Sequence, residues 1–314
     1  MLIRKLVQSG PSSFTIALPR EWVRLHKLSK GDLITLEVQA DKIILSKKIF
    51  EKKEDEAPDI TITVDGKEFR ELQRDIRAAY LSAKRIILTG KTLQQKLADL
   101  KKEVSELVAL EIVDESRMSL VCRNFVNMGD VSVANLIRRM DNIVRSMFHD
   151  LPSCRGHTDV AEAIRARDAS INRLSFLTLK CMRSGLLDPE ILADLKLSYK
   201  EIVMYWELNL QLEKIGDEIK RVARLLAKVT KKHESILHLC STVTKNYEDV
   251  MKSFYTQDSQ LSDLVALRRD QLINACDEFF EKNTTLVISE ITGKLKGIMS
   301  HITDISRLVR YLVI

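Results

Sequence analysis

The residue types that most often carry catalysis occur in this chain without the spacing that catalysis needs. The six histidines show no His-Glu-x-x-His or related zinc-type spacing, and there is no Gly-x-Ser-x-Gly motif or dinucleotide-type glycine fingerprint. Gly90-Lys91-Thr92 resembles the end of a phosphate-binding P-loop, but the upstream glycine of a P-loop is absent. We interpret these residues as a turn into a helix with Thr92 as its N-cap, and we expect that the protein is not an enzyme.

The five cysteines form no Cys-x-x-Cys pair and are odd in number. This pattern favours buried free thiols in a reducing compartment over a disulfide framework or a structural zinc site. No apolar run approaches the roughly 20 residues that a bilayer span needs, and residues 1–8 lack the apolar core of a signal peptide. We therefore expect a cytoplasmic protein with no membrane insertion.

Positive charge is concentrated at the N-terminus. Residues 1–53 contain 11 Lys and Arg against 5 Asp and Glu, an excess of +6 that equals the formal net charge of the whole chain. The remaining residues therefore sum to about zero. An excess confined to one segment indicates a polyanion partner for that segment. Aromatic residues make up only 5% of the chain, which argues against recognition by base stacking.

The first 48 residues predict a small β module. Apolar and basic residues alternate over residues 2–8, a turn follows at 9–13, and alternation resumes over 14–18. Pro19 ends that strand and can open a helix over residues 20–27, and a turn containing Gly31 leads to strands at 33–38 and 42–46. A unit this small is expected to pair with a second copy. A charged linker follows at residues 47–58.

The rest of the chain divides into an α/β connector and a helical region. Residues 59–128 predict strands and helices in the order β-α-β-α-β-β, with strands at 60–64, 85–89, 110–113 and 120–126 and helices at 68–83 and 92–109. From residue 131 onward, helical periodicity predicts six helices, at 131–151, 158–185, 189–231, 233–256, 258–282 and 284–313.

An internal repeat organises the six helices. The segment Arg-Asp-Ala-Ser-Ile-Asn, which begins at Arg167, recurs 102 residues later as Arg-Asp-Gln-Leu-Ile-Asn, beginning at Arg269. Each copy lies in the second helix of its half. We interpret the repeat as a duplication that gives two tandem three-helix bundles, at residues 131–231 and 233–314.

The N-terminal module resembles the AbrB/SpoVT-type swapped-hairpin β-barrel. The likeness lies, in order, in Arg4-Lys5-Leu6, in the segment Phe14 to Pro19, and in the Lys-Gly-Asp turn that ends at Asp32. Two chains of that family interleave their hairpins, and the dimer presents basic side chains to DNA. The resemblance therefore implies a homodimer through this barrel, with five candidate DNA-binding residues: Arg4, Lys5, Arg20, Arg24 and Lys27. The alternative is that the barrel only dimerises and that these side chains form a solvated face.

The helical region carries a second resemblance. The segment Leu212 to Ile219, with sequence Leu-Glu-Lys-Ile-Gly-Asp-Glu-Ile, is similar to the third-helix signature of PhoU, and the repeated Asp-x-x-Ile-Asn segments resemble that family's second-helix pattern. With the N-terminal module, the chain resembles archaeal PhoU-like phosphate uptake regulators. The resemblance implies a multidomain, mainly α fold: a small swapped-hairpin β-barrel, an α/β connector and two tandem three-helix bundles.

The PhoU resemblance also implies a metal site. Carboxylate pairs four residues apart can hold metal clusters in that family, because this spacing puts two oxygen ligands on one helix face. The candidate ligands for a divalent or iron-type ion here are Glu213, Asp217, Asp168, Asn172, Asp270 and Asp304. The second half departs from the pattern, because aligning Asp304 with Asp217 places Ser300 where Glu213 stands.

Cations on the same helix offer an alternative to a metal. Lys220, Arg221 and Arg224 fall close to the two acids on a helical wheel. Glu213 can then pair with Lys220, and Asp217 with Arg221, with no metal present. We take this salt-bridged helix face as the first expectation, and if a metal binds, we expect it in the first half.

These observations lead to two functional hypotheses. In the first, the protein regulates phosphate uptake and homeostasis as a DNA-binding transcription regulator with PhoU-like sensing helices. In the second, it contacts the ATPase of a phosphate transporter or another signalling protein, and the barrel serves only for dimerisation. A metal-dependent helical-bundle enzyme would need inward-facing carboxylate and histidine ligands on several helices, and the sequence lacks that pattern.

Overall fold

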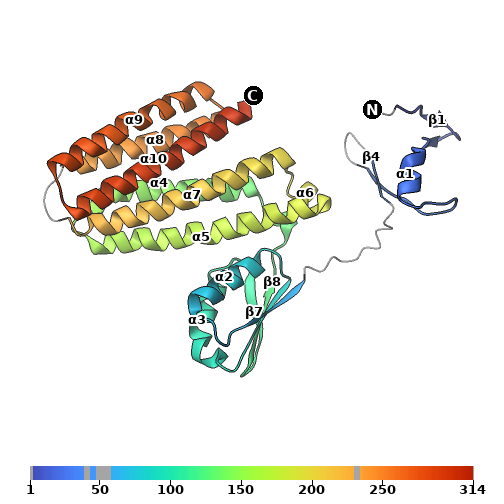
Figure 1. Cartoon of the computed structure of the whole chain (residues 1–314), viewed down its shortest axis with the longest axis horizontal. Coiled ribbons are helices and arrows are strands. Elements are labelled where there is room, and N and C mark those ends of the chain that lie inside the picture. The colour runs from blue at the N-terminus through green and yellow to red at the C-terminus, as the bar shows by residue number, and fades with distance from the viewer. Residues whose placement is uncertain (1–2, 39–42, 47–57, 230–233, 314) are drawn as a thin grey trace. The chain divides into compact units, whose positions relative to one another are not determined.

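The computed structural model describes residues 3–38, 43–46, 58–229 and 234–313 (Figure 1). The chain divides into two compact units, Met1–Glu56 and Ala57–Ile314. The connection between the strands expected at 33–38 and 42–46 and most of the expected linker, residues 47–57, lie outside the described residues. In the part of the chain that is described, no helix is long and apolar enough to cross a bilayer.

The first unit contains two antiparallel strand pairs and one short helix. Strands β1 (Val7–Gln8) and β2 (Phe14–Thr15) pair with each other, helix α1 (Arg20–Leu25) follows, and β3 (Thr35–Val38) pairs with β4 (Ile43–Ser46). The strand expected over residues 2–8 is therefore only two residues long. The closed barrel, which takes hairpins from two chains, stays a prediction.

Helix α1 ends two residues earlier than the sequence predicted. Lys27 has a φ of 50°, in the left-handed region, and its N–H donates to the carbonyl of Arg24. The next N–H, of Leu28, reaches back to the carbonyl of Val23. These two bonds form a Schellman cap, which satisfies the last carbonyls of the helix but stops it before Lys27.

The second unit begins with a four-stranded sheet. Strands β5 (Asp59–Thr63), β6 (Arg85–Thr89), β8 (Ser119–Asn124) and β7 (Leu110–Glu115) lie in that order, and only β5 and β6 run parallel. Helices α2 (Phe69–Tyr80) and α3 (Leu93–Ser105) lie on one side of it (Figure 1). The strands bury alternate residues against these helices, because side chains of a strand point to opposite faces. The predicted β-α-β-α-β-β order is confirmed.

The helical region forms the largest part of the second unit. Short 3₁₀ segments at Met128–Asp130 and Leu151–Cys154 accompany α4 (Val133–Asp150), α5 (Thr158–Leu187), α6 (Pro189–Asp194), α7 (Tyr199–Leu226), α8 (Glu234–Thr256), α9 (Ser259–Lys282) and α10 (Leu286–Val313). Helices α4, α5 and α7 make the first bundle, and α8, α9 and α10 make the second (Figure 1). Helices α7 and α10 lie side by side where the bundles meet. The mainly α fold with two three-helix bundles is confirmed.

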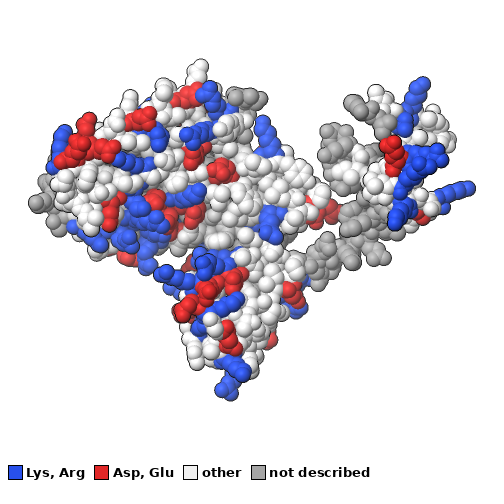
Figure 2. All heavy atoms as spheres, in the orientation of Figure 1, with Lys and Arg blue, Asp and Glu red and all other residues white. Residues whose placement is uncertain are grey.

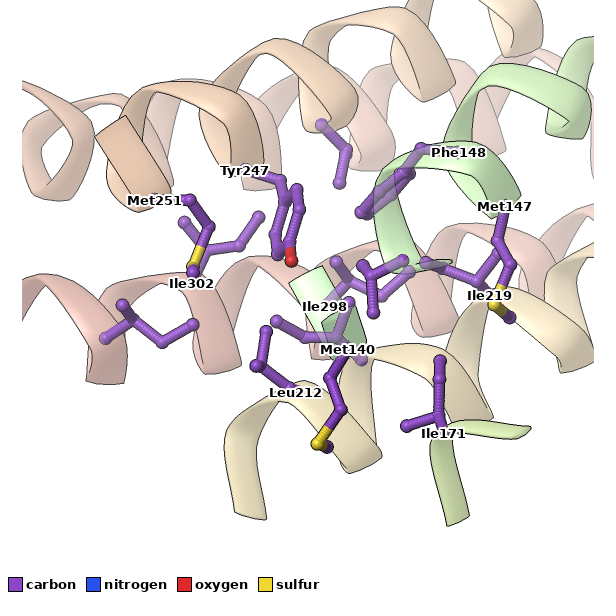
Figure 3. Packing of buried hydrophobic residues seen from close by; sticks show 14 of the residues in the cluster. Met140, Met147, Phe148, Ile171, Leu212, Ile219, Tyr247, Met251, Ile298 and Ile302 are labelled. Carbon is purple, nitrogen blue, oxygen red and sulfur yellow. The ribbon is translucent and has the colours of Figure 1, made fainter. Parts of the chain in front are cut away.

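The two bundles share one hydrophobic core. Buried side chains of both halves belong to a single cluster, and Figure 3 shows some of them together: Met140, Phe148, Ile171 and Leu212 from the first bundle and Tyr247, Met251 and Ile302 from the second. All five cysteines are buried and free, as predicted. The duplication therefore produces one packed body of helices rather than two separate cores.

One predicted helix is wrong. The segment 189–231 was expected to be continuous, but it breaks into α6 and α7 at Lys196, which has a φ of 54°. The N–H of Leu197 donates to the carbonyl of Leu192, which ends α6 in a Schellman cap. Ser198 and Glu201 then form a capping box that starts α7. The Ser-x-x-Glu spacing was the sequence signal for this break.

Candidate functional site

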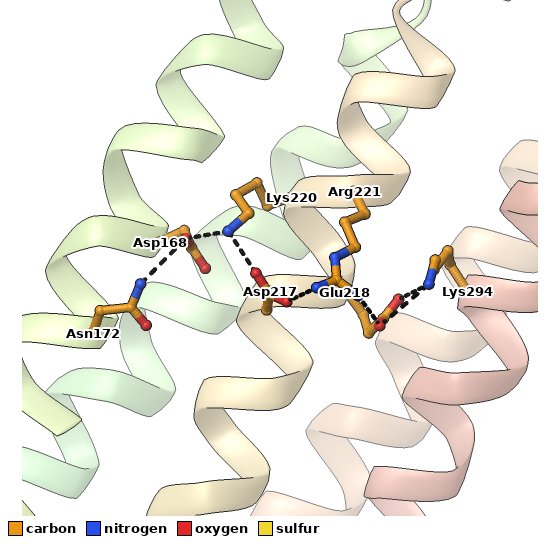
Figure 4. A network of polar contacts seen from close by, with 7 residues as sticks. All are labelled: Asp168, Asn172, Asp217, Glu218, Lys220, Arg221 and Lys294. Carbon is orange, nitrogen blue, oxygen red and sulfur yellow. Dashed lines mark hydrogen bonds and ion pairs between the residues drawn. The ribbon is translucent and has the colours of Figure 1, made fainter. Parts of the chain in front are cut away.

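Two of the predicted acidic residues of the first bundle, Asp168 and Asp217, meet at one lysine (Figure 4). Asp168 and Asn172 lie on α5, and Asp217 and Lys220 lie on α7. The Lys220 ammonium donates to Asp168 Oδ2 at 2.7 Å and to Asp217 Oδ1 at 2.5 Å. Asn172 Nδ2 lies 3.5 Å from Asp168 Oδ2. Three of the six predicted metal ligands are thus brought together, but a cation of the chain already lies between them.

Further ion pairs extend this cluster toward the second bundle. Arg221 binds Asp217 Oδ2 at 2.5 Å and Glu218 Oε1 at 2.9 Å, and Lys294 of α10 lies 3.3 Å from Glu218 (Figure 4). The expected pair of Asp217 with Arg221 is confirmed. The expected pair of Glu213 with Lys220 is wrong, because the ammonium is directed at Asp168 and Asp217 instead. Alternating charges thus connect α5, α7 and α10.

The pKa values of the cluster reflect its burial. Burial raises the pKa of Asp168, and the hydrogen bond from Lys220 only partly offsets this effect. Burial also raises the pKa of Glu213, with the negative charges of Asp217 and Asp168 adding to the shift. For Lys220, burial lowers the pKa, but hydrogen bonds to the two aspartates outweigh it and leave a net raised value. Lys220 is therefore protonated where these carboxylates are ionised.

These residues do not fit a metal ion as they are arranged. The described residues contain no group of three or more His, Cys, Asp or Glu that could hold one. Asp168 Oδ2 and both carboxylate oxygens of Asp217, which a hard cation would need, are bound by ammonium and guanidinium groups. The salt-bridged helix face expected from the sequence is what the geometry supports.

The second bundle does not reproduce the cluster. The side chain of Asp270 is 82% exposed and pairs with its neighbour Arg269. Asp304 pairs with Arg307 on its own helix at 2.9 Å, and Ser300 donates its hydroxyl to the carbonyl of Lys296. The matching sequence segments of the two halves therefore have different surroundings, which agrees with the incomplete acidic pair of the second half.

A glycine lies where the two helices that carry the cluster pack against each other. A Cβ on Gly216 of α7 would lie 2.8 Å from Ile171 Cδ1 of α5, closer than such atoms approach. The glycine therefore leaves room on α7 for the side chain of Ile171, next to Asp168. Within the PhoU-like segment Leu212 to Ile219, this is the residue whose type the packing requires.

The predicted DNA-binding residues lie on the first unit, and all five are exposed. Arg20 and Arg24 are one turn apart on α1, and Lys27 follows the end of that helix. Arg4 and Lys5 precede β1 and lie outside the strand in which the sequence placed them. Figure 2 shows blue Lys and Arg side chains gathered on this unit.

The same unit exposes its apolar side chains. None of its described residues is buried. Phe14 is 60% exposed, and further large apolar residues of the unit are also exposed: Ile3, Leu6, Val7, Ile16, Leu25, Leu33, Leu36, Ile43 and Ile44. A single copy of the unit therefore has no hydrophobic core of its own, although its strands carry the apolar residues that a core needs.

A comparison with protein families finds a match at the N-terminus. A family model described as antidote-toxin recognition MazE, a bacterial antitoxin, matches residues 7–53. The N-terminal segment is a MazE-like, AbrB-like domain. A comparison with curated proteins finds no match.

Two solved PhoU structures are similar to this chain. The PhoU of Pseudomonas aeruginosa is 22% identical, with a TM-score of 0.49 over 58% of this chain and 95% of that one. The PhoU of Streptococcus pneumoniae is 16% identical, with a TM-score of 0.47 over 58% of this chain and 93% of that one.

The P-loop-like segment forms the predicted turn into α3, and its polar groups contact a carboxylate. The carboxylate of Asp65 accepts the backbone N–H groups of Lys91 and Thr92 at 2.8 Å each and the Thr92 hydroxyl at 2.7 Å. A Cβ on Gly90 would lie 2.8 Å from Asp65 Oδ1. Thr92 stands at the N-cap position of α3, but its side chain makes no capping bond. The donors that a P-loop offers to phosphate are here satisfied by a carboxylate of the chain itself.

Proposed function

We propose that this protein is a homodimeric, DNA-binding regulator of phosphate uptake. In this proposal the N-terminal unit provides both the dimer contact and the DNA contact, and the helical bundles act as the sensing part. The observation that carries the proposal is that residues 1–53, whose excess of +6 equals the net charge of the chain, have no buried side chain among those that the structure describes.

The dimer contact follows from the exposed apolar side chains of the first unit. A module of fewer than about 50 residues buries too little surface to be stable alone, and exposed apolar side chains are stabilised when a partner removes them from water. A second copy of the same unit supplies the matching apolar residues. The AbrB-like resemblance implies the same arrangement, with hairpins from two chains in one barrel.

The DNA contact follows from charge. The cations Arg20, Arg24 and Lys27 are exposed on and beside one short helix, and pairing two copies doubles their number. Lys and Arg side chains bind phosphates with an affinity that falls steeply with salt. The link to phosphate uptake rests on the PhoU-like segment Leu212 to Ile219 and on the duplicated helices.

The DNA part is tested by titrating the full chain with random duplexes and with promoter duplexes of phosphate uptake genes. We expect binding that weakens between about 50 and 200 mM salt, with tighter binding to the promoter duplexes. The double variant Arg20→Ala/Arg24→Ala is expected to reduce the salt slope by about 2, since each lost phosphate contact removes about 0.9. A matched control replaces Arg165 and Arg183, two exposed arginines of α5, and leaves the slope unchanged.

The dimer part is tested by light scattering of the full chain. Phe14→Asp is expected to yield a monomer, whereas Leu267→Asp, at an exposed apolar position of α9, leaves the mass of a dimer. A dimer that binds neither duplex at low salt contradicts the DNA part. That result favours a regulator that acts by contact with a phosphate transporter or a signalling protein.

A further inference from the structure

The ammonium of Lys220 lies where carboxylates of two different helices converge. It contacts Asp168 Oδ2 of α5 at 2.7 Å and Asp217 Oδ1 of α7 at 2.5 Å (Figure 4). Asn172 lies one turn from Asp168 and contacts the same oxygen at 3.5 Å. Carboxylate and amide oxygens are the ligands of hard divalent cations. The ammonium thus lies between carboxylate oxygens of two helices, and the amide of Asn172 is next to one of them.

One oxygen of this set has no partner. The side chain of Asp168 is only 6% exposed, and its Oδ1 atom is buried without a hydrogen bond. A buried carboxylate is stable only when its charge is balanced nearby, so Asp168 depends on Lys220. Oδ1 lies beside Gly216 of α7, where a Cβ would be 3.7 Å from it. The site therefore has a carboxylate oxygen, Asp168 Oδ1, that the Lys220 ammonium does not use.

We propose that Lys220 is a built-in cation that occupies a latent divalent-metal site and excludes metal from it. A tethered ammonium neutralises Asp168 and Asp217 without the loss of freedom that a free ion incurs. A divalent ion entering the site would have to displace Lys220 and would be repelled by it and by Arg221, which holds the other oxygen of Asp217. The substitution Lys220→Met removes the cation but keeps the length of the side chain, and it leaves both aspartates and Asn172 available as ligands.

The duplicated half supplies a matched comparison. Asp304 and Arg307 lie 87 residues after Asp217 and Lys220 and take their places on α10. Arg307 binds Asp304 at 2.9 Å, but Asp270, the counterpart of Asp168, is 82% exposed and pairs with Arg269. No carboxylate of α9 thus meets Asp304 among the contacts of the described residues. Arg307→Met removes an equivalent cation without leaving a ligand set behind.

The experiment measures Mn²⁺ binding to the full chain by equilibrium dialysis with elemental analysis, and by the electron paramagnetic resonance signal of the ion. We expect that the unaltered protein and Arg307→Met bind no stoichiometric Mn²⁺. Lys220→Met is expected to bind one ion per chain, at least about tenfold more tightly than the unaltered protein, since affinity follows the charge and number of ligands. Adding Asp168→Asn to Lys220→Met is expected to abolish this gain.

Two results would overturn the proposal. The first is one Mn²⁺ per chain in the unaltered protein that disappears in Asp168→Asn, because the site would then accept metal despite Lys220. The second is a folded Lys220→Met that gains no Mn²⁺. If Lys220→Met does not fold by circular dichroism, Lys220→Gln replaces it, and a folded Lys220→Gln without added Mn²⁺ affinity counts equally against the proposal. None of these readouts depends on DNA binding.

Discussion

Tyr247 of helix α8 donates its hydroxyl to Asp141 of helix α4 over 2.8 Å, and this bond joins the two bundles inside their shared core. Asp141 is 2% exposed and also accepts Arg145 Nε at 2.9 Å and the Tyr255 hydroxyl at 3.0 Å. Burial and the charge of Asp141 raise the pKa of Tyr247 well above its ordinary value, so its hydroxyl remains a donor. One carboxylate thus connects the first bundle to two tyrosines of the second.

We expect Tyr247→Phe to lower the free energy of unfolding by about 2 kcal/mol. The substitution removes a hydrogen bond to a charged acceptor in the core, and such bonds contribute about 1.5–3 kcal/mol. Tyr255→Phe is the control: it removes a bond to the same carboxylate from a partly exposed side chain, so a smaller loss is expected. Urea denaturation of both variants checks this order. Equal stability of Tyr247→Phe and the unaltered protein would show that the bond contributes nothing to the core.

Glycine substitutions are expected to have opposite effects on helices α7 and α10. Gly216→Ala would place a Cβ 2.8 Å from Ile171 Cδ1 and force this buried side chain to shift in a packed core, at a cost of about 1–3 kcal/mol. Gly293→Ala, in the interior of α10, would meet nothing within 4 Å and should stabilise by about 0.5–1 kcal/mol through helix propensity. Thermal unfolding measures both effects: the midpoint should fall in Gly216→Ala and rise in Gly293→Ala. A Gly216→Ala variant as stable as Gly293→Ala contradicts the close approach of α5 and α7.

Local periodicity was enough to predict most helices and strands, but it could not predict which side chains meet. The pair Asp141 and Tyr247 is separated by 106 residues, and nothing in the neighbourhood of either residue indicates the other. Asp168 and Asp270 occupy the same position in the repeat, yet one is buried and the other is exposed. The difference arises from how α5 and α9 pack, which the repeated segment itself does not encode.

The candidate site was predicted in part. Helical spacing correctly paired Asp217 with Arg221, because both lie on one helix. The predicted pair of Lys220 with Glu213 was wrong, because Lys220 contacts Asp168, which lies on another helix 52 residues earlier. The break at Lys196 was missed although the spacing of Ser198 and Glu201 indicates a new helix start.

Lys180 should make stability rise with pH above about 8. Its ammonium is buried between α5 and the α/β connector, where it donates to the carbonyl of Tyr80 at 2.8 Å. Burial lowers the pKa of Lys180 from 10.5 to about 8. Between these two values the unfolded chain holds more protons than the folded one, so the free energy of unfolding rises with pH. We expect a gain of up to about 2 kcal/mol by pH 9.5.

The variant Lys180→Met should lack this rise, because it has no group to deprotonate. Lys252→Met, at an exposed position of α8, should keep it. Urea denaturation of the three proteins from about pH 7 to pH 9.5 measures the difference. A rise of the same size in Lys180→Met would assign it to another group.

The carboxylate of Asp65 gives a second pH dependence, at the acid end. Hydrogen bonds from the Thr92 hydroxyl and from the N–H groups of Lys91 and Thr92 lower the pKa of Asp65 from 3.8 to about 2. Because the folded-state pKa is depressed, the stabilisation is present above pH 3.8 and is lost as the pH falls toward about 2. The stability difference between the unaltered protein and Asp65→Asn should therefore shrink over this range. Asp114→Asn, at an exposed acid of β7, is the control, and its stability difference from the unaltered protein should not shrink in this way.

Thr92→Val removes the strongest of the three donors, so the carboxyl carbon of Asp65 should titrate at higher pH in a ¹³C NMR experiment. An unchanged titration in Thr92→Val would mean that the backbone N–H groups alone hold the carboxylate at the start of α3.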